Sequence, residues 1–278
     1  MALLKVRRRR PVFAAGLATV VLAFAGLAAA PAQAAKPPAP PLAYVALGDS
    51  YAAGQGAEPY LDSCLRSPSS YPALADASKW VRLVQNAACS GAGGDDVVAN
   101  QLKRLSPDTD VVTLTVGGNN LDLPALVLAC STDELACAAA LADLQARLTQ
   151  AILDPASSPL VADLAATIDA IQAKAPNADV YVTGYPLLFD PAYPDPGLAF
   201  AVNSLTVMLN MVIENVAEAK DATYVDVTGA FAGHGVGSGD PWFNFDPTNP
   251  FDPENLHPNA AGYVAYYTAL ANAGAFAP

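Results

Sequence analysis

The sequence predicts an α/β fold in which one parallel sheet is covered by helices on both faces. Short, β-branched and almost continuously apolar segments recur along the chain, as expected of strands buried in a parallel sheet. Amphipathic segments with apolar residues three or four positions apart lie between them and predict helices. We find no internal repeat and no second core, so the alternation of the two kinds of segment favours a single sheet.

The first 34 residues have the three parts of a secretory signal peptide. A basic cluster at Arg7 to Arg10 precedes an apolar run from Val12 to Ala30, and residues 32–34 form an A-x-A cleavage site. An uncleaved membrane anchor is the alternative, because the run is close to the roughly 20 residues that span a bilayer. The run is rich in Ala and Gly, so we favour cleavage after residue 34 and secretion to the extracellular space. The export route is left open.

Removal of residues 1–34 makes the remaining chain strongly acidic. It takes away five of the 14 Lys and Arg residues and none of the 26 Asp and Glu residues, which leaves a net charge of −17. Such a charge repels phosphate backbones and anionic lipid surfaces, and no basic patch stands out along the sequence. We therefore expect no nucleic-acid partner and, after cleavage, a monomer without stable membrane insertion.

The folded domain is expected to span residues 43–278, after a proline-rich lead-in at residues 35–42 that should be extended and weakly ordered. Five segments are predicted as strands: Ala43–Leu47, Val81–Gln85, Asp110–Val116, Asp179–Thr183 and Thr223–Val227. Helices are predicted for residues 141–152, 161–171 and 199–220, and after Pro258. Because ligands of such sheets bind at the carboxyl ends of the strands, we look for chemistry in the loops that follow them.

Four cysteines follow the signal peptide, and an even number in an oxidising compartment indicates two disulfides. Of the three possible connectivities we favour Cys64 with Cys89 and Cys130 with Cys137. Residues 131–134 resemble a capping box, which places Cys130 just before a helix and Cys137 in its second turn. Buried free thiols are the alternative. With only two histidines and no C-x-x-C motif, we expect no metal site.

The first predicted strand ends in Gly48-Asp49-Ser50. A serine directly after a buried strand, beside glycines that permit tight turns, displays its hydroxyl at the edge of the sheet. Ser50 is therefore a candidate nucleophile. Gly-Asp-Ser is also a common turn, so the tripeptide alone does not decide the matter. The other serine-hydrolase signature, G-x-S-x-G, is absent from the sequence.

Glycines and asparagines follow the second and third predicted strands. Gly91 lies in the segment after the second strand, and Gly117-Gly118-Asn119-Asn120 follows the third. Backbone N–H groups and an asparagine amide are the donors that an oxyanion requires during acyl transfer. Ordinary loop formation is the alternative for either segment taken singly.

A histidine precedes the last predicted helix. His257 lies in Glu254–Asn259, and the following Pro258 suits a first helical turn, which fixes the histidine at a junction. The other histidine, His234, lies in a glycine-rich stretch and is expected at the surface. A lone histidine is usually structural, so His257 is a candidate general base only because of the segments that accompany it.

Four segments, in this order, resemble the four blocks of the SGNH/GDSL hydrolases: GDSYAAG at residues 48–54, Gly91, GGNN at residues 117–120 and ENLHPN at residues 254–259. The resemblance covers essentially the whole mature domain. With the signal peptide, the cysteine pairs and Gly184-Tyr185-Pro186, the chain looks most like the secreted actinobacterial esterases and lipases. The resemblance implies a three-layer α/β/α sandwich around a five-stranded, flavodoxin-like parallel sheet.

The resemblance also assigns roles to individual residues. It implies that Ser50 is the nucleophile and that His257 is its general base. It implies an oxyanion hole made by the backbone N–H groups of Ser50 and Gly91 and by the side chain of Asn119. Hydrolysis would proceed through an acyl-enzyme and would require no cofactor.

Two positions depart from the family pattern. Asn120 stands where the third block usually has aspartate, so a local contact is expected to differ. Glu254 stands where the last block usually has an aspartate that orients the histidine. Glu254 is our candidate third member, and Asp252 or a backbone carbonyl of the Trp242 to Asp246 loop are the alternatives.

The sequence thus predicts a serine esterase or lipase that acts on a small-molecule or lipid ester. Acyl-chain length and natural substrate are not encoded. A phospholipase or a carbohydrate acetyl esterase of the same family is an alternative. A secreted binding module that keeps the fold without the reaction is an alternative of another class, and the intact set of Ser50, Gly91, Asn119 and His257 argues against it.

Overall fold

The computed structural model describes residues 40–277, so the predicted signal peptide and the first part of the proline-rich lead-in lie outside the described residues. The described chain forms a five-stranded parallel sheet with the strand order β2-β1-β3-β4-β5. The strands are β1 (Leu42–Gly48), β2 (Val81–Asn86), β3 (Val111–Thr115), β4 (Asp179–Thr183) and β5 (Thr223–Val225). The predicted α/β class and parallel sheet are confirmed.

The pattern of burial explains why the central strands are almost continuously apolar. All of β3 and the last five residues of β1 are buried, because helices cover both faces of the sheet. The edge strands β2 and β5 have exposed positions and are correspondingly more polar. The structure begins β1 at Leu42, one residue before the predicted domain start, and ends β5 at Val225, two residues before the predicted end.

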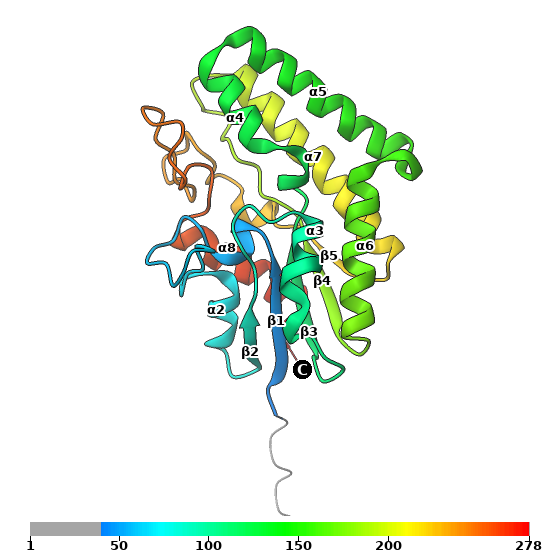
Figure 1. Cartoon of the computed structure of the whole chain (residues 1–278). Coiled ribbons are helices and arrows are strands. Elements are labelled where there is room, and N and C mark those ends of the chain that lie inside the picture. The colour runs from blue at the N-terminus through cyan, green and yellow to red at the C-terminus, as the bar shows by residue number, and fades with distance from the viewer. Residues whose placement is uncertain (1–39, 278) are drawn as a thin grey trace, which may run out of the picture. The chain divides into compact units, whose positions relative to one another are not determined.

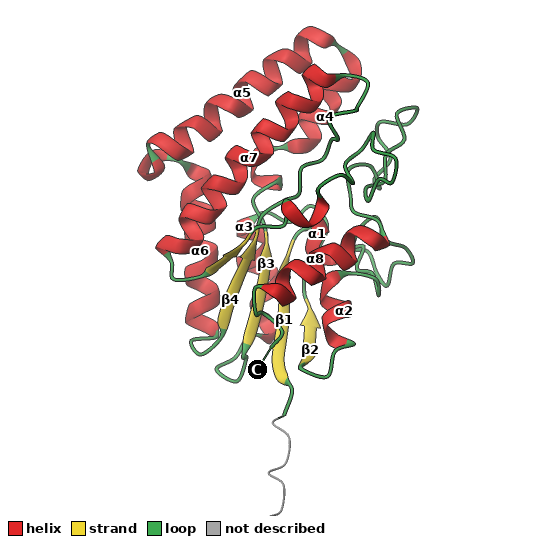
Figure 2. Ribbon diagram, turned by 180° about the vertical axis from the view of Figure 1, so that it is seen from behind, coloured by secondary structure: helices red, strands yellow, loops and turns green. Residues whose placement is uncertain are grey.

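Helices form the two outer layers, as Figures 1 and 2 show from opposite sides. On one face α2 (Tyr71–Asp76) packs against α8 (Ala260–Asn272). On the other face α3 (Gly94–Asp96) packs against α6 (Pro159–Lys174). The long helix α7 (Pro196–Ala219) packs against α6, β4 and β5, and it turns a face of buried residues inward. Among the described helices, α7 is also the one long and apolar enough to cross a membrane by composition alone.

A helical hairpin extends beyond the carboxyl-terminal edge of the sheet. It consists of α4 (Leu123–Thr132) and α5 (Glu134–Leu153), and α5 packs along α7 (Figure 1). Because α4 begins a few residues after β3, the hairpin is attached directly to the loop at which β3 ends. Strand-end loops and hairpin therefore share one end of the molecule (Figure 2).

Two predicted helix starts are wrong. Asp133, not Ser131, caps α5, since its side chain accepts a hydrogen bond of 2.7 Å from the Ala136 N–H, while Ser131 lies within α4. Cys130 is therefore inside one helix rather than just before one. The last helix starts at Ala260, with Asn259 as its cap, so Pro258 lies before the helix and not in its first turn.

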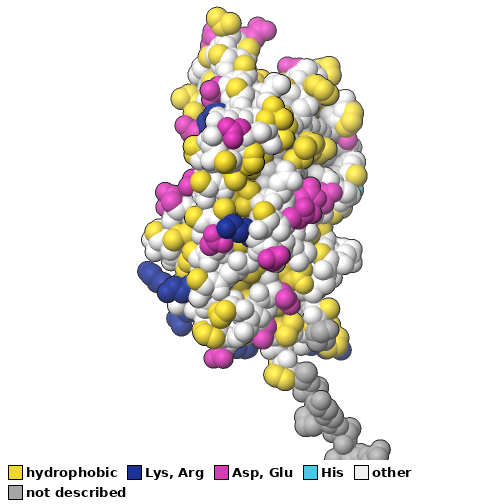
Figure 3. Space-filling view, turned by 90° about the vertical axis from the view of Figure 1, so that its right-hand side faces the viewer, with side chains coloured by type: hydrophobic (Ala, Val, Ile, Leu, Met, Phe, Trp, Pro, Cys, Tyr) yellow, Lys and Arg dark blue, Asp and Glu magenta, His cyan; other side chains and the backbone are white. Residues whose placement is uncertain are grey.

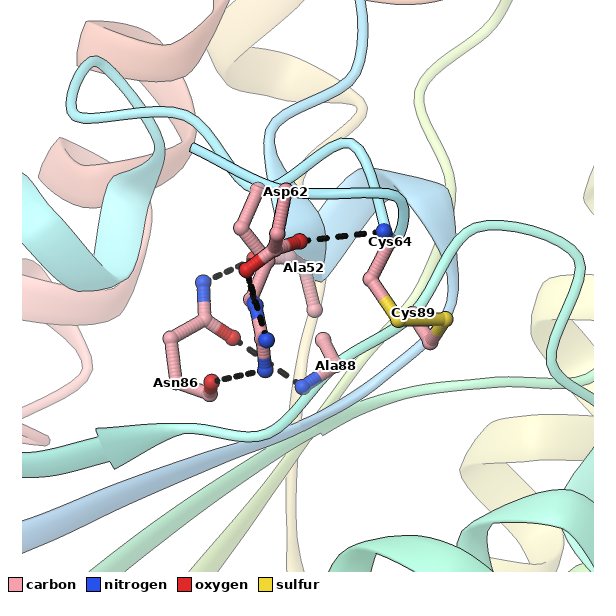
Figure 4. A network of polar contacts seen from close by, with 7 residues as sticks. Ala52, Asp62, Cys64, Asn86, Ala88 and Cys89 are labelled. Carbon is pink, nitrogen blue, oxygen red and sulfur yellow. Dashed lines mark hydrogen bonds and ion pairs between the residues drawn. A yellow bond between two sulfur atoms is a disulfide. The ribbon is translucent and has the colours of Figure 1, made fainter. Parts of the chain in front are cut away.

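Two disulfides join Cys64 to Cys89 and Cys130 to Cys137, which are the predicted pairs. The second bridge joins the end of α4 to the first turn of α5 and so closes the hairpin. The first bridge anchors the long loop after α1 (Ser50–Ala53) to the loop after β2. Figure 4 shows the polar contacts around it, in which Asp62 accepts from the Cys64 N–H and Asn86 donates to the Ala52 carbonyl.

Acidic side chains are scattered over the face shown in Figure 3, where few Lys and Arg side chains are seen. This distribution agrees with the formal net charge of −12 for the whole sequence. The acidic side chains on this face are spread out instead of being gathered in one patch.

We predict that the disulfide that closes the longer stretch of chain stabilises the fold more. The sequence separations are 25 and 7 residues, for which loop-closure entropy gives about 3.5 and about 2.5 kcal/mol. The double variant Cys64→Ala/Cys89→Ala should thus lose more stability than Cys130→Ala/Cys137→Ala, measured as the free energy of urea unfolding. Two unchanged unfolding midpoints would contradict this account.

Candidate active site

Ser50 lies at the carboxyl end of β1, an inner strand of the sheet. Gly48 makes this possible: its φ is +127°, and a Cβ there would lie 2.1 Å from the Thr115 carbonyl oxygen of the neighbouring strand. The buried Gln101 amide bonds both the N–H and the carbonyl of Gly48. Asp49 then caps α1 by accepting a hydrogen bond from the Tyr51 N–H, so the turn that carries the serine is fixed on both sides.

His257 meets Ser50 although 207 positions separate them in the sequence. The imidazole Nε2 lies 2.9 Å from Ser50 Oγ. The histidine is held by a backbone ladder, since Asn244 donates to the His257 carbonyl and accepts from the Leu256 N–H. A serine hydroxyl within hydrogen-bond distance of an imidazole is the arrangement in which the imidazole can remove the hydroxyl proton.

The other imidazole nitrogen, Nδ1, lies 3.0 Å from the backbone carbonyl oxygen of Asn255. The Glu254 carboxylate instead accepts a hydrogen bond from the Tyr60 hydroxyl, and Asp252 accepts from the Glu254 N–H. Our expectation that Glu254 orients the histidine therefore does not match the geometry. A backbone carbonyl does so, but from Asn255 and not from the 242–246 loop.

The surroundings of His257 favour its neutral form. Burial lowers the pKa of the imidazole to about 4. The hydrogen bond with the Asn255 carbonyl raises this pKa, but its effect is smaller than that of burial. Because the Asn255 carbonyl can only accept, it fixes the proton on Nδ1 and leaves Nε2 as the acceptor that faces Ser50. A neutral imidazole with this tautomer is ready to act as a base.

A buried carboxyl group, that of Asp49, directly precedes Ser50 in the sequence. Asp49 accepts hydrogen bonds from the Tyr51 N–H and the Tyr185 hydroxyl, and burial raises the pKa of its carboxyl to about 7. The Tyr185 hydroxyl in turn accepts from the Gly118 N–H at 3.1 Å. This chain of contacts links the ends of β1, β3 and β4 below the site.

The loops after β2 and β3 bring the predicted oxyanion donors to the same edge. Gly91 has a φ of +83°, and a Cβ added there would meet nothing within 4 Å, so its backbone borders open space. The Asn119 amide donates one hydrogen to the Ala92 carbonyl at 3.0 Å, which ties the two loops together. The same amide nitrogen carries a second hydrogen.

Asn120, which departs from the family pattern, has contacts that an aspartate would not make in the same way. Its amide nitrogen donates to the Asp163 carboxylate of α6 at 3.1 Å, and its carbonyl oxygen accepts from the Gly94 N–H at 3.4 Å. An aspartate here would place two carboxylates in contact. The asparagine thus permits the loop after β3 to rest on α6.

Several residues at this edge make contacts that the sequence did not predict. Tyr51, Gln55 and Tyr60 contact the segment that carries His257, and Tyr185 supports Asp49. No local sequence pattern predicts these contacts. Tyr51 is marked only by its position directly after Ser50. His234, by contrast, stacks on Trp242 with ring centroids 3.5 Å apart and has no contact with Ser50.

Comparisons with known proteins agree on one family. The sequence model of the GDSL-like Lipase/Acylhydrolase family matches residues 46–265. Lipase 1 of Streptomyces coelicolor is 36% identical over 271 residues, which cover 93% of this chain and 97% of that protein.

Among the described residues, no group of three or more His, Cys, Asp and Glu side chains is arranged to hold a metal ion.

Solved structures give the same result. The extracellular lipase of Streptomyces rimosus superposes with a TM-score of 0.75 at 35% identity, covering 84% of this chain and 99% of that one. The phospholipase A1 of Streptomyces albidoflavus NA297 superposes with a TM-score of 0.74 at 33% identity, with the same coverage.

We predict that His257 titrates near pH 4, well below the ordinary histidine value of about 6.5, because burial disfavours its charged form. The chain has two histidines, so a His234→Gln variant leaves a single imidazole signal for NMR titration. Since the unfolded chain binds the proton at the ordinary pKa, His257 should lower stability as the pH falls from about 6.5 to about 4. A midpoint between 6 and 7 would mean that the imidazole is hydrated.

Proposed function

The chain belongs to the GDSL-like lipase/acylhydrolase family and is an ester hydrolase, and on this premise we propose that it cleaves carboxylic esters through an acyl-enzyme on Ser50, with His257 as general base. The observation that carries the proposal is the 2.9 Å contact between Ser50 Oγ and a neutral imidazole Nε2. The binding-module alternative leaves that contact without a purpose.

The first half of the reaction forms the acyl-enzyme. As Ser50 Oγ attacks the ester carbonyl carbon, its proton passes to Nε2 of His257. The carbonyl oxygen becomes an oxyanion that accepts hydrogen bonds from the N–H groups of Ser50 and Gly91 and from the Asn119 amide. His257 then gives its proton to the leaving alkoxide oxygen as the ester C–O bond breaks. The alcohol departs and the acyl group remains on Ser50.

The second half releases the acid. His257 takes a proton from a water molecule, whose oxygen attacks the acyl carbon in the same oxyanion hole. The proton then returns from Nε2 to Ser50 Oγ as the acyl bond breaks, which restores the free enzyme.

A backbone carbonyl beside Nδ1 has consequences for this cycle. The Asn255 carbonyl fixes the tautomer and orientation of the imidazole, but it carries no full charge to stabilise the imidazolium. The low pKa of His257 makes it a weaker base toward Ser50 and a stronger acid toward the leaving alkoxide. The reaction therefore relies on the oxyanion hole for much of its transition-state stabilisation.

Lipid esters are the substrates that we propose. The relatives are named lipases and a phospholipase A1, and large apolar side chains are exposed on the helices beyond the strand ends. Leu128 of α4, Leu135 of α5 and Phe200 of α7 are 53%, 79% and 76% exposed. Exposed apolar side chains of this size favour contact with acyl chains over contact with a polysaccharide. Phospholipids are the second candidate, because of the phospholipase A1 relative.

We also propose that the protein is exported and works outside the cell. The predicted signal peptide supports export, and so does the extracellular lipase of Streptomyces rimosus. Both disulfides suit an oxidising compartment.

We predict that Ser50→Ala abolishes the hydrolysis of p-nitrophenyl esters and labelling by a serine-directed phosphonate, since no nucleophile remains. The loss in kcat should be on the order of 10⁴-fold or more. Rates of the wild type on p-nitrophenyl esters of increasing acyl length would define its acyl preference. Circular dichroism of the variant controls for folding, and wild-type rates in a folded variant would overturn the assignment.

We predict that Glu254→Gln keeps kcat/KM within about threefold of wild type. The glutamine can still accept the Tyr60 hydrogen bond, and the partner of Nδ1 is unchanged. A carboxylate that holds the catalytic histidine costs about 10⁴-fold when it is made an amide. A loss of that size here would show that Glu254 orients the imidazole during turnover.

A further inference from the structure

The segment that carries His257 is held by hydrogen bonds from side chains that lie within ten residues after Ser50 in the sequence. The Tyr51 hydroxyl donates to the Leu256 carbonyl at 2.6 Å, and the Gln55 amide donates to the Pro253 carbonyl. The Tyr60 hydroxyl donates to the Glu254 carboxylate. Side chains of residues 51–60 thus contact three residues of the histidine loop, defined here as residues 253–257.

Leu256, directly before the histidine, has the most strained backbone conformation of that loop. Its φ is +62°, in the left-handed region that a leucine seldom adopts. Such a conformation persists only where neighbouring contacts enforce it. The Asn244 carbonyl accepts from the Leu256 N–H, and the Tyr51 hydroxyl donates to the Leu256 carbonyl. The peptide between Leu256 and His257 is therefore fixed through its carbonyl by Tyr51.

The ring of Tyr51 reaches the catalytic groups as well. It lies 5.5 Å from the His257 ring, centroid to centroid, and packs edge-on against Tyr185 at 5.2 Å. Tyr51 is 9% exposed and follows Ser50 directly in α1, so its backbone is fixed to the nucleophile. Burial raises the pKa of the Tyr51 hydroxyl above its ordinary value, which keeps it a donor at working pH.

We propose that Tyr51 is a positioning residue for the reaction, which holds the peptide before His257 and so sets the imidazole against Ser50. It fixes the backbone that carries the imidazole, whereas the carboxylate of a catalytic triad binds the imidazole directly. This inference rests on the proposed function for its kinetic consequence, although its effect on the imidazole exists without substrate.

Tyr266 offers a matched control. Its hydroxyl donates to the Gly184 backbone carbonyl at 2.7 Å, the residue is fully buried, and its ring lies 6.2 Å from that of Tyr51. Tyr266→Phe therefore removes the same kind of buried hydrogen bond from the same aromatic cluster, but not from the histidine loop. A merely structural role for the Tyr51 hydroxyl would make the two variants alike.

The experiment compares Tyr51→Phe and Tyr266→Phe with wild type on a p-nitrophenyl ester. We expect Tyr51→Phe to lose on the order of 10-fold or more in kcat with KM within about twofold, and Tyr266→Phe to keep wild-type kcat. Equal losses in both variants, or no loss in Tyr51→Phe, would overturn the proposal.

A second readout needs no substrate. In a His234→Gln background, NMR titration of His257 should move from about 4 upward toward 6.5 in Tyr51→Phe, because a displaced imidazole gains water, and should stay in Tyr266→Phe. An unmoved midpoint in Tyr51→Phe would overturn the proposal. If Ser50→Ala stayed active, the proposed function would fail while this titration still tested the role of Tyr51.

Discussion

The contact between Ser50 Oγ and His257 Nε2 is the constraint on which the arrangement of the site depends. The two atoms lie 2.9 Å apart although their residues are 207 positions apart in the sequence. Its two ends are held by different means. Ser50 is placed by β1, a buried strand between two others, whereas His257 lies on the loop that enters α8. The relative position of the two groups therefore depends on how α8 packs on the sheet, and so on the whole core.

Much of the fold and of the site could be predicted from the sequence because local patterns report them. Continuous apolar runs gave all five strands, and glycines beside Ser50 and Gly91 marked the points where the backbone turns sharply. The start of α5 could not be predicted, because Ser131 and Asp133 are both good caps. In the structure α4 continues through Ser131 and packs against α5, which leaves Asp133 as the cap.

The partner of His257 could not be predicted for a similar reason. A carboxylate three positions before the histidine suggested Glu254, yet its direction is decided by Tyr60, almost two hundred residues away. The left-handed Leu256 turns the backbone so that the Asn255 carbonyl meets Nδ1. Nothing in the sequence near a leucine signals that conformation, because it arises from distant contacts with Tyr51 and Asn244.

The Cys64–Cys89 bridge lies two residues from Gly91 and four from Tyr60, and the Cys64 carbonyl accepts from the Ser90 N–H at 3.1 Å. The bridge stabilises the ordered arrangement of these loops. That arrangement stabilises the bridge by the same free energy, because such coupling is reciprocal. Formation of this disulfide and ordering of the loops that carry Tyr60 and Gly91 are therefore coupled. A change that loosens either loop should therefore make this bridge easier to reduce.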